Sequence, residues 1–101
     1  MERKFEYQFE WDAAKALRNL REHGVSFERG ATVFLDPRAM SMFDDEHSEE
    51  EERWITLGLD RAGALLVVSH TYREETEAGA KIRLIPVRGA NQSEAAQYQG
   101  T

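Results

Sequence analysis

The chain has 101 residues, of which 41% are hydrophobic and 32% charged, and its formal net charge is −6. This composition is typical of one folded domain and argues against a disordered chain. No apolar run approaches the roughly 18–20 residues that cross a bilayer, and the N-terminal residues lack the apolar segment of a signal peptide. With no cysteine, disulfides, thiolate zinc sites and cysteine nucleophiles are excluded. A cytoplasmic protein without a membrane partner is the simplest interpretation.

The negative charge is concentrated in one segment, residues 44–52, which we call the acidic block. Seven of its nine residues are Asp or Glu, and the rest of the chain holds 12 acids against 13 Lys and Arg. The remainder is therefore nearly neutral, which weakens the objection that the net charge raises against a polyanionic substrate. The block is interpreted first as a solvated loop. The alternatives are a shield over a basic face, a docking site for a basic partner segment and, least favoured, a divalent-cation site.

The first third of the chain predicts a strand followed by two helices. Aromatic residues at positions 5, 7, 9 and 11 alternate with polar ones, as in a half-buried strand. Asp12 is expected to cap a helix that ends at Gly24. The apolar residues of that helix recur at helical spacing and are expected to face the core: Ala13, Ala14, Leu17 and Leu20. Ser26 is expected to cap a second helix, which ends at Asp36-Pro37.

The second half predicts mainly strands. Residues 54–59 and 64–71 form two of them around a turn at 60–63, and the apolar run 65–68 indicates a central strand. Residues 39–43 are a candidate for a further short strand, and 76–80 are expected to form a loop or hairpin tip. The last strand, 81–88, contains Pro86, which cannot donate to a ladder and so predicts an edge position or a bulge.

Asn91 or Ser93 is expected to cap a short C-terminal helix carrying Glu94 and Tyr98. The resulting fold class is α+β, with one domain spanning residues 1–101. We expect an antiparallel sheet with the two early helices on one face.

Five groups of residues, in order along the chain, make the sequence resemble the BrnT family of toxins. They are Phe9-Glu-Trp-Asp12 with Lys15, Asn19, His23-Gly-Val25 and Phe27; Ala31-Thr-Val-Phe34 with Asp36-Pro37; His47-Ser-Glu49 with Glu51-Glu-Arg-Trp-Ile-Thr-Leu-Gly58; Leu65–Val68 with His70-Thr71 and Arg73; and Ile82-Arg-Leu-Ile85 with Arg88, Ala90, Glu94 and Tyr98. Each group alone is a weak signal, whereas the ordered set is fairly specific.

The resemblance implies a RelE-like fold and a ribonuclease toxin of a type II toxin–antitoxin system that blocks translation. It also implies a hetero-oligomer with a BrnA-type antitoxin, through which alone the toxin would reach operator DNA. The chain departs from the family pattern near its C-terminus. Pro86-Val87 replaces the usual Ser-Ala, Gly89 stands where a basic residue is expected, and residues 91–97 carry no positive charge. If that helix normally binds phosphates, several contacts are missing.

Metal-free RNA cleavage needs a base, an acid and cations that stabilise the charge on the phosphate. Arginine suits the last role because its guanidinium matches phosphate oxygens. We predict His70, Arg73, Arg83 and Arg88 as catalytic residues, with Arg83 on the same strand face as Ile85 and Val87. Arg53, Lys81 and Tyr98 are predicted to bind RNA, and no metal or cofactor is expected.

Each assignment has a structural alternative. An arginine can pair with an acid of the acidic block or with Glu74 or Glu75, and His70 can hydrogen-bond a loop carbonyl. Tyr98 is slightly more readily interpreted as pinning the last helix to the sheet. His23 suits a helix C-terminus, His47 a solvated position, and the histidine spacing does not fit zinc.

Two functions from different classes follow from these residues. The first is an endoribonuclease toxin. The second is a catalytically weakened module that persists as an antitoxin-binding partner or co-repressor subunit, which the uncharged C-terminal helix favours. A free-standing metabolic enzyme is disfavoured because the sequence carries no nucleotide or cofactor motif.

Overall fold

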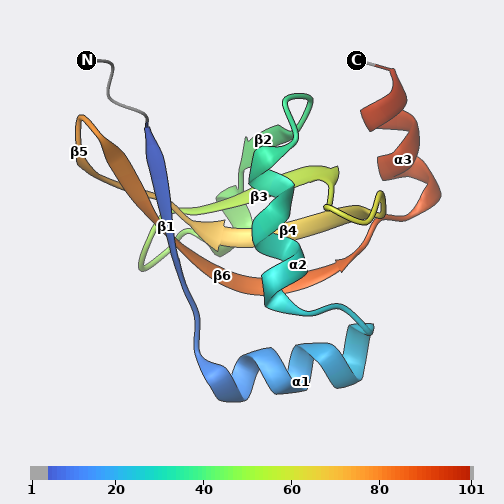
Figure 1. The fold of residues 1–101 in the computed structure, drawn as a ribbon, viewed down its shortest axis with the longest axis horizontal. Helices are drawn as coiled ribbons and strands as arrows, with labels where there is room; N and C mark the ends of the chain where they lie inside the picture. Colours follow the sequence, from blue (N-terminus) through green and yellow to red (C-terminus); the bar gives the residue numbers. More distant parts are fainter. Residues whose placement is uncertain (1–4, 101) are drawn as a thin grey trace.

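The computed structural model describes residues 5–100 (Figure 1). Residues 1–4, on which the interpretation of the N-terminus partly rests, lie outside them. The elements in chain order are β1 (Glu6–Glu10), α1 (Ala13–His23), α2 (Phe27–Thr32), the 3-10 turn η1 (Val33–Leu35), β2 (Met40–Phe43), the 3-10 turn η2 (Asp45–His47), β3 (Arg53–Leu59), β4 (Leu65–Thr71), β5 (Arg73–Thr76), β6 (Gly79–Gly89) and α3 (Gln92–Gln99). None of these helices is long and apolar enough to cross a membrane.

The helix caps predicted from the sequence are confirmed. The Asp12 carboxylate accepts from the Ala14 N–H at 2.8 Å, and Gly24 ends α1 with a φ of 69°. Ser26 caps α2. Asn91 caps α3, where it forms a reciprocal capping box with Glu94. The starts of all three helices and the end of α1 are therefore local properties of the sequence, because a capping side chain or a glycine next to each one fixes it.

The sheet has the strand order β1-β6-β4-β3-β2, and β5 pairs with β6 outside this path. The central position expected for residues 65–68 is confirmed in β4. The expectation of an antiparallel sheet is wrong at one edge, because β1 runs parallel to β6 and the sheet is mixed. The strand β5 was not predicted either, since its Arg-Glu-Glu-Thr sequence has no apolar alternation and all four residues are exposed.

The two faces of the sheet differ in what covers them. On one, which we call the helix face, Phe27 of α2 and Val33 of η1 pack on Val68, Ile82 and Leu84. The other, the open face, carries a smaller cluster at one end, where Tyr98 of α3 packs with Leu57 and Val67. Figure 1 shows α2 crossing the sheet and α3 standing at the end of β6.

A bulge in β6 confirms the prediction made from Pro86. Val68 pairs with Val87, whereas His70 pairs with Leu84. An advance of two residues along β4 therefore corresponds to three residues along β6, so β6 contains one extra residue. The extra residue reverses the alternation, and Val87 joins the helix-face core. The expectation that Arg83 and Val87 share a face is therefore wrong.

The orientation of α1 also differs from expectation. Leu17 and Leu20 are 63% and 48% exposed, whereas Asn19 is only 6% exposed. The Asn19 amide donates to the carbonyls of Val25 and Val87, at 3.0 and 2.8 Å, and its oxygen accepts from the Val87 N–H at 3.0 Å. A polar side chain beside the β6 bulge, rather than the leucine stripe, thus anchors α1 to the sheet.

Candidate functional site

Five predicted cationic residues lie on the open face of the sheet. Directly paired residues of neighbouring strands share a face. Arg53 pairs with Thr71, Arg73 with Lys81, and Arg88 with Val67 of the open-face cluster. Lys81 and Arg83 alternate along β6 with Ala80, Ile82 and Leu84, which are buried. The strand period of two therefore directs both away from the helix face.

Three of these cations converge on one depression of about 340 Å³, which we call the basic hollow. Arg73, Lys81 and Arg83 line it from β5 and β6, and Thr71 lines it from β4. The Thr71 hydroxyl accepts from the Arg83 backbone N–H at 3.3 Å. Tyr72 and three carboxylates complete the lining, and the carboxylates are Glu10, Glu51 and Glu52. The hollow therefore combines cations that suit a phosphate with groups that can accept or donate a proton.

Each cation of the basic hollow already has an acidic partner. Arg83 pairs with Glu51 of the acidic block. Arg73 and Lys81 both contact Glu75, at 3.3 and 3.4 Å, and their hydrogen bonds hold the pKa of that carboxyl below its usual value. The alternative that the arginines pair with nearby acids is thus confirmed for Arg73 and Arg83. The structure also favours the shield among the interpretations of the acidic block.

Arg53 lies against the acidic block rather than in the basic hollow. It lines a neighbouring depression together with Glu46, Glu49, Glu50 and Glu51. Its Nε is buried and has no hydrogen-bond partner in the described part of the chain. Glu51 lines both depressions, so one carboxylate stands between Arg53 and the basic hollow.

Arg88 and Tyr98 lie at the other end of the open face. The two terminal nitrogens of the Arg88 guanidinium, Nη1 and Nη2, donate to Glu94, each at 2.8 Å, which raises the pKa of Arg88 and lowers that of Glu94. The Tyr98 hydroxyl donates to Asp36 at 2.5 Å, and the tyrosine is 6% exposed. Tyr98 thus joins α3 to the body of the fold, as its structural alternative predicted.

His70 faces the opposite way, since its cross-strand partners are Trp54 and Leu84. The ring is 2% exposed and stacks edge-on against Phe34, with centroids 4.9 Å apart. Burial lowers its pKa below the usual value. The structure therefore does not bring His70 together with the arginines, from which the sheet separates it.

Hydrogen bonds fix the tautomer of His70. Nδ1 lies 2.9 Å from the Thr71 carbonyl, which can only accept, so Nδ1 carries the proton. In the neutral ring Nε2 then accepts from the Thr56 hydroxyl at 2.7 Å, and Thr56 accepts from Ser41 at 2.7 Å. The alternative predicted a histidine bound to a loop carbonyl; the Nδ1 contact is to a carbonyl, but Thr71 is the last residue of β4 and not part of a loop.

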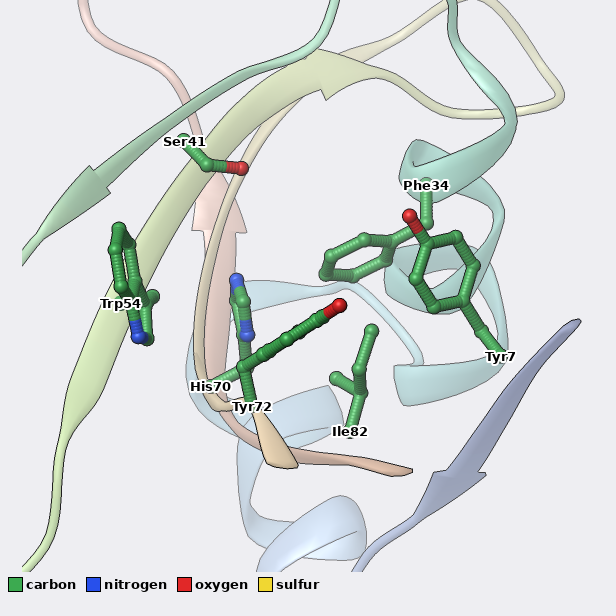
Figure 2. Close-up of a pocket in the computed structure, with 7 residues that line it drawn as sticks. All are labelled: Tyr7, Phe34, Ser41, Trp54, His70, Tyr72 and Ile82. Carbon is green, nitrogen blue, oxygen red and sulfur yellow. The ribbon is translucent and has the colours of Figure 1, made fainter. Parts of the chain in front are cut away.

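A pocket of about 210 Å³ opens beside His70 on the helix face (Figure 2). Aromatic side chains dominate its lining, which comprises Tyr7, Phe34, Ser41, Trp54, His70, Tyr72 and Ile82. The Trp54 indole N–H is buried without a hydrogen-bond partner in the described residues. The pocket is thus apolar and distinct in chemistry from the basic hollow.

The remaining histidines have no part in either cavity's chemistry. His23 is the last residue of α1, as expected, and His47 is exposed, with its Nδ1 2.9 Å from Asp44. Among residues 5–100 no group of three or more His, Asp or Glu is arranged to hold a metal ion. Thr71 and Glu10 were not predicted as site residues, because only the pairing of strands distant in sequence brings them to Arg83.

Comparison with known proteins gives this geometry a context. Residues 11–94 match the family described as the ribonuclease toxin BrnT of type II toxin–antitoxin systems. The crystal structure of the Brucella abortus ribonuclease toxin BrnT shares the fold with a TM-score of 0.59 and 17% identity, covering 86% of this chain and 100% of that one. No protein with a curated description matches. The family match spans well over half of the sequence, and the chain therefore belongs to the BrnT family of ribonuclease toxins of type II toxin–antitoxin systems.

Proposed function

We propose that this protein is an endoribonuclease that cleaves RNA without a metal ion and thereby inhibits translation. The observation that carries the proposal is the convergence of Arg73, Lys81 and Arg83 on the basic hollow, on a sheet face that α2 does not cover. A single-stranded RNA can lie across such a face with one phosphate among the three cations. Membership of a ribonuclease toxin family supports the same chemistry.

In the proposed reaction the 2′-oxygen of a ribose attacks the neighbouring phosphorus, the bond to the 5′-oxygen breaks, and a 2′,3′-cyclic phosphate remains. Arg73, Lys81 and Arg83 would stabilise the extra charge on the phosphate oxygens. Glu10 and Glu52 line the same hollow and are the candidates to take the proton of the 2′-hydroxyl and, once protonated, to return it to the departing 5′-oxygen. Proton transfer by His70 stays a prediction, and it would require the RNA to reach the helix face.

The family description also supports an antitoxin as partner. We propose that it is of the BrnA type, that it forms a hetero-oligomer with this chain, and that contact with operator DNA comes only through it. The charge of −6 supports this division of roles, because a net negative charge repels the DNA polyanion.

A second function, the catalytically weakened module, is favoured by two observations. The cations of the basic hollow are all engaged by Glu51 and Glu75. In addition, α3 contains no Lys or Arg, so this end of the open face adds little attraction for phosphate. Under this proposal the chain still binds its antitoxin but cleaves RNA slowly or not at all.

The test uses purified protein and a single-stranded RNA in the presence of EDTA. We expect cleavage that leaves cyclic phosphate ends, and Arg83→Ala should slow it about 100- to 1,000-fold, as for loss of one donor that stabilises a transition state. Arg61→Ala, in the turn between β3 and β4, serves as the matched control and should cleave normally. Full activity of Arg83→Ala would remove the basic hollow from the mechanism, whereas an inert wild-type protein that binds antitoxin would support the second function.

A further inference from the structure

The helix α1 carries an apolar stripe on its exposed side. Ala13, Leu17 and Leu20 recur at intervals of four and three residues, which places them on one side of the helix. All three are exposed, and Leu17 is exposed by 63%. Isolated exposed leucines are ordinary, but a helix whose apolar side faces solvent while a polar Asn19 is buried is not. The fold does not need this stripe, since Ala16 and Asn19 provide the contacts of α1 with the core.

Positive charge borders the stripe on one side, where Arg21 follows Leu17 by one turn and Arg18 lies next to Arg21, whereas Lys15 lies on the opposite side of the helix. Lys15, Arg18 and Arg21 lie on α1 and are exposed, and Glu22 is its single acid, so the helix has a charge of +2 in a chain of −6. None of these three cations makes an ion pair with any residue from 5 to 100. The cations of the basic hollow, in contrast, are all paired. A basic surface that no acid neutralises therefore lies on α1, beside exposed leucines.

We propose that this stripe is the docking surface for an acidic amphipathic helix of the antitoxin. The inference rests on the proposed function only in taking an antitoxin as the partner. Leu17 and Leu20 would supply the apolar anchors, and Arg18 and Arg21 would select carboxylates beside the partner's own apolar side. RNA fits this surface less well, because it would meet the cations but leave the leucines in water.

The direct test measures the affinity of this chain for the antitoxin encoded by the adjacent reading frame, using isothermal titration calorimetry. Leu17→Gln/Leu20→Gln should weaken binding about 100-fold, since each buried leucine is worth roughly tenfold. Glutamine preserves helix propensity, so the urea midpoint should not fall. Leu35→Gln is the matched control, because Leu35 is 79% exposed at the end of η1, and it should bind as tightly as the wild type.

A second double variant tests the arginines of the surface separately from its leucines. Arg18→Glu/Arg21→Glu should also weaken binding, and the loss should shrink as salt is raised. Cleavage of RNA should be unchanged in both double variants. Wild-type affinity in Leu17→Gln/Leu20→Gln would overturn the inference while leaving the ribonuclease intact. Loss of RNA cleavage in these variants, with antitoxin binding retained, would equally overturn it and assign α1 to RNA.

Discussion

At the scale of single residues, Asn19 is the side chain on which the fold depends most unexpectedly. Its amide makes three buried hydrogen bonds, two of them with the backbone N–H and carbonyl of Val87. Val87 directly follows the bulge at Pro86, where strand pairing is irregular. Asn19 therefore satisfies backbone groups of β6 from a neighbouring helix, and in doing so fixes α1 against the sheet.

We predict that Asn19→Ala lowers the free energy of unfolding by about 3 kcal/mol, because buried polar groups that lose their partners cost roughly 1–3 kcal/mol each. Urea unfolding followed by circular dichroism measures this change. Gln92→Ala, at an exposed position of α3, is the control and should lie within about 0.5 kcal/mol of the wild type. A loss below about 1 kcal/mol in Asn19→Ala would mean that water replaces the amide.

His70 predicts a pH dependence of stability. Burial lowers its pKa in the folded protein, whereas in the unfolded chain the pKa is about 6.5. As the pH falls below about 6.5, His70 therefore binds a proton in the unfolded chain but stays neutral in the folded protein. The free energy of unfolding then decreases with falling pH, by at most about 1.4 kcal/mol per pH unit from this group. At pH 7 and above the contribution of His70 is fully present.

The measurement is the free energy of unfolding between pH 7.5 and pH 5 for the wild type and His70→Gln, whose amide can keep hydrogen bonds to Thr56 and Thr71. The range stays above pH 5 because the carboxyls with lowered pKa values, such as Glu94, remain ionised there. The variant should show a shallower decline below pH 6.5. Identical slopes would show that His70 titrates alike in both states. RNA cleavage by the same variant tests its predicted catalytic role.

At the scale of elements, the boundaries were predictable and the orientations were not. Caps such as Asp12 and Asn91 act within one turn, so the sequence carries them directly. The parallel direction of β1 depends on β6, about seventy residues away, and alternation contains no information on direction. The leucine stripe of α1 was assigned to the core for a similar reason. Periodicity identifies an apolar side but not what covers it.

The candidate site was predictable in its residue types and only in part in its arrangement. The arginines of β5 and β6 were identified from chemistry and family resemblance, and register brings Arg73 and Lys81 together. Whether His70 shares a face with Arg83 depends on which residue of β6 it pairs with. The bulge between Ile85 and Val87 shifts that partner to Leu84, and a regular alternation of residues does not predict the shift. Glu51 could be proposed as a partner only as one of many acids, because a loop contact has no periodic signal.

At the scale of the whole molecule, the position of charge matters more than its sum. The acidic block gives the chain its negative charge, yet Glu51 reaches across to Arg83, and Glu50 lies beside Arg53. The open face thus carries five cations, of which Arg73, Lys81, Arg83 and Arg88 form ion pairs with carboxylates. On α1 the cations remain unpaired, so the two surfaces should respond differently to changes in the block.

We predict that Glu50→Gln/Glu51→Gln strengthens binding of a single-stranded RNA about 2- to 5-fold at ~0.1 M salt. This is the range expected when an exposed ion pair of up to about 1 kcal/mol, that of Glu51 with Arg83, no longer competes with a phosphate. The logarithm of affinity should also fall more steeply with that of salt, by about 0.7 for each additional phosphate that the protein neutralises. Fluorescence anisotropy with a 2′-O-methyl oligonucleotide, which cannot be cleaved by attack of the 2′-oxygen, measures both quantities.

The control is Glu22→Gln/Glu28→Gln, which changes the net charge equally but replaces exposed acids of α1 and α2. If the position of the removed charges controls RNA binding, this control should change the affinity for RNA less than about twofold, since charges on the far side of the sheet are screened beyond about 10 Å. Antitoxin affinity should stay constant in Glu50→Gln/Glu51→Gln, because its proposed docking surface lies on α1. Equal gains in both double variants would mean that total charge controls RNA binding, and the shield would then have no specific role.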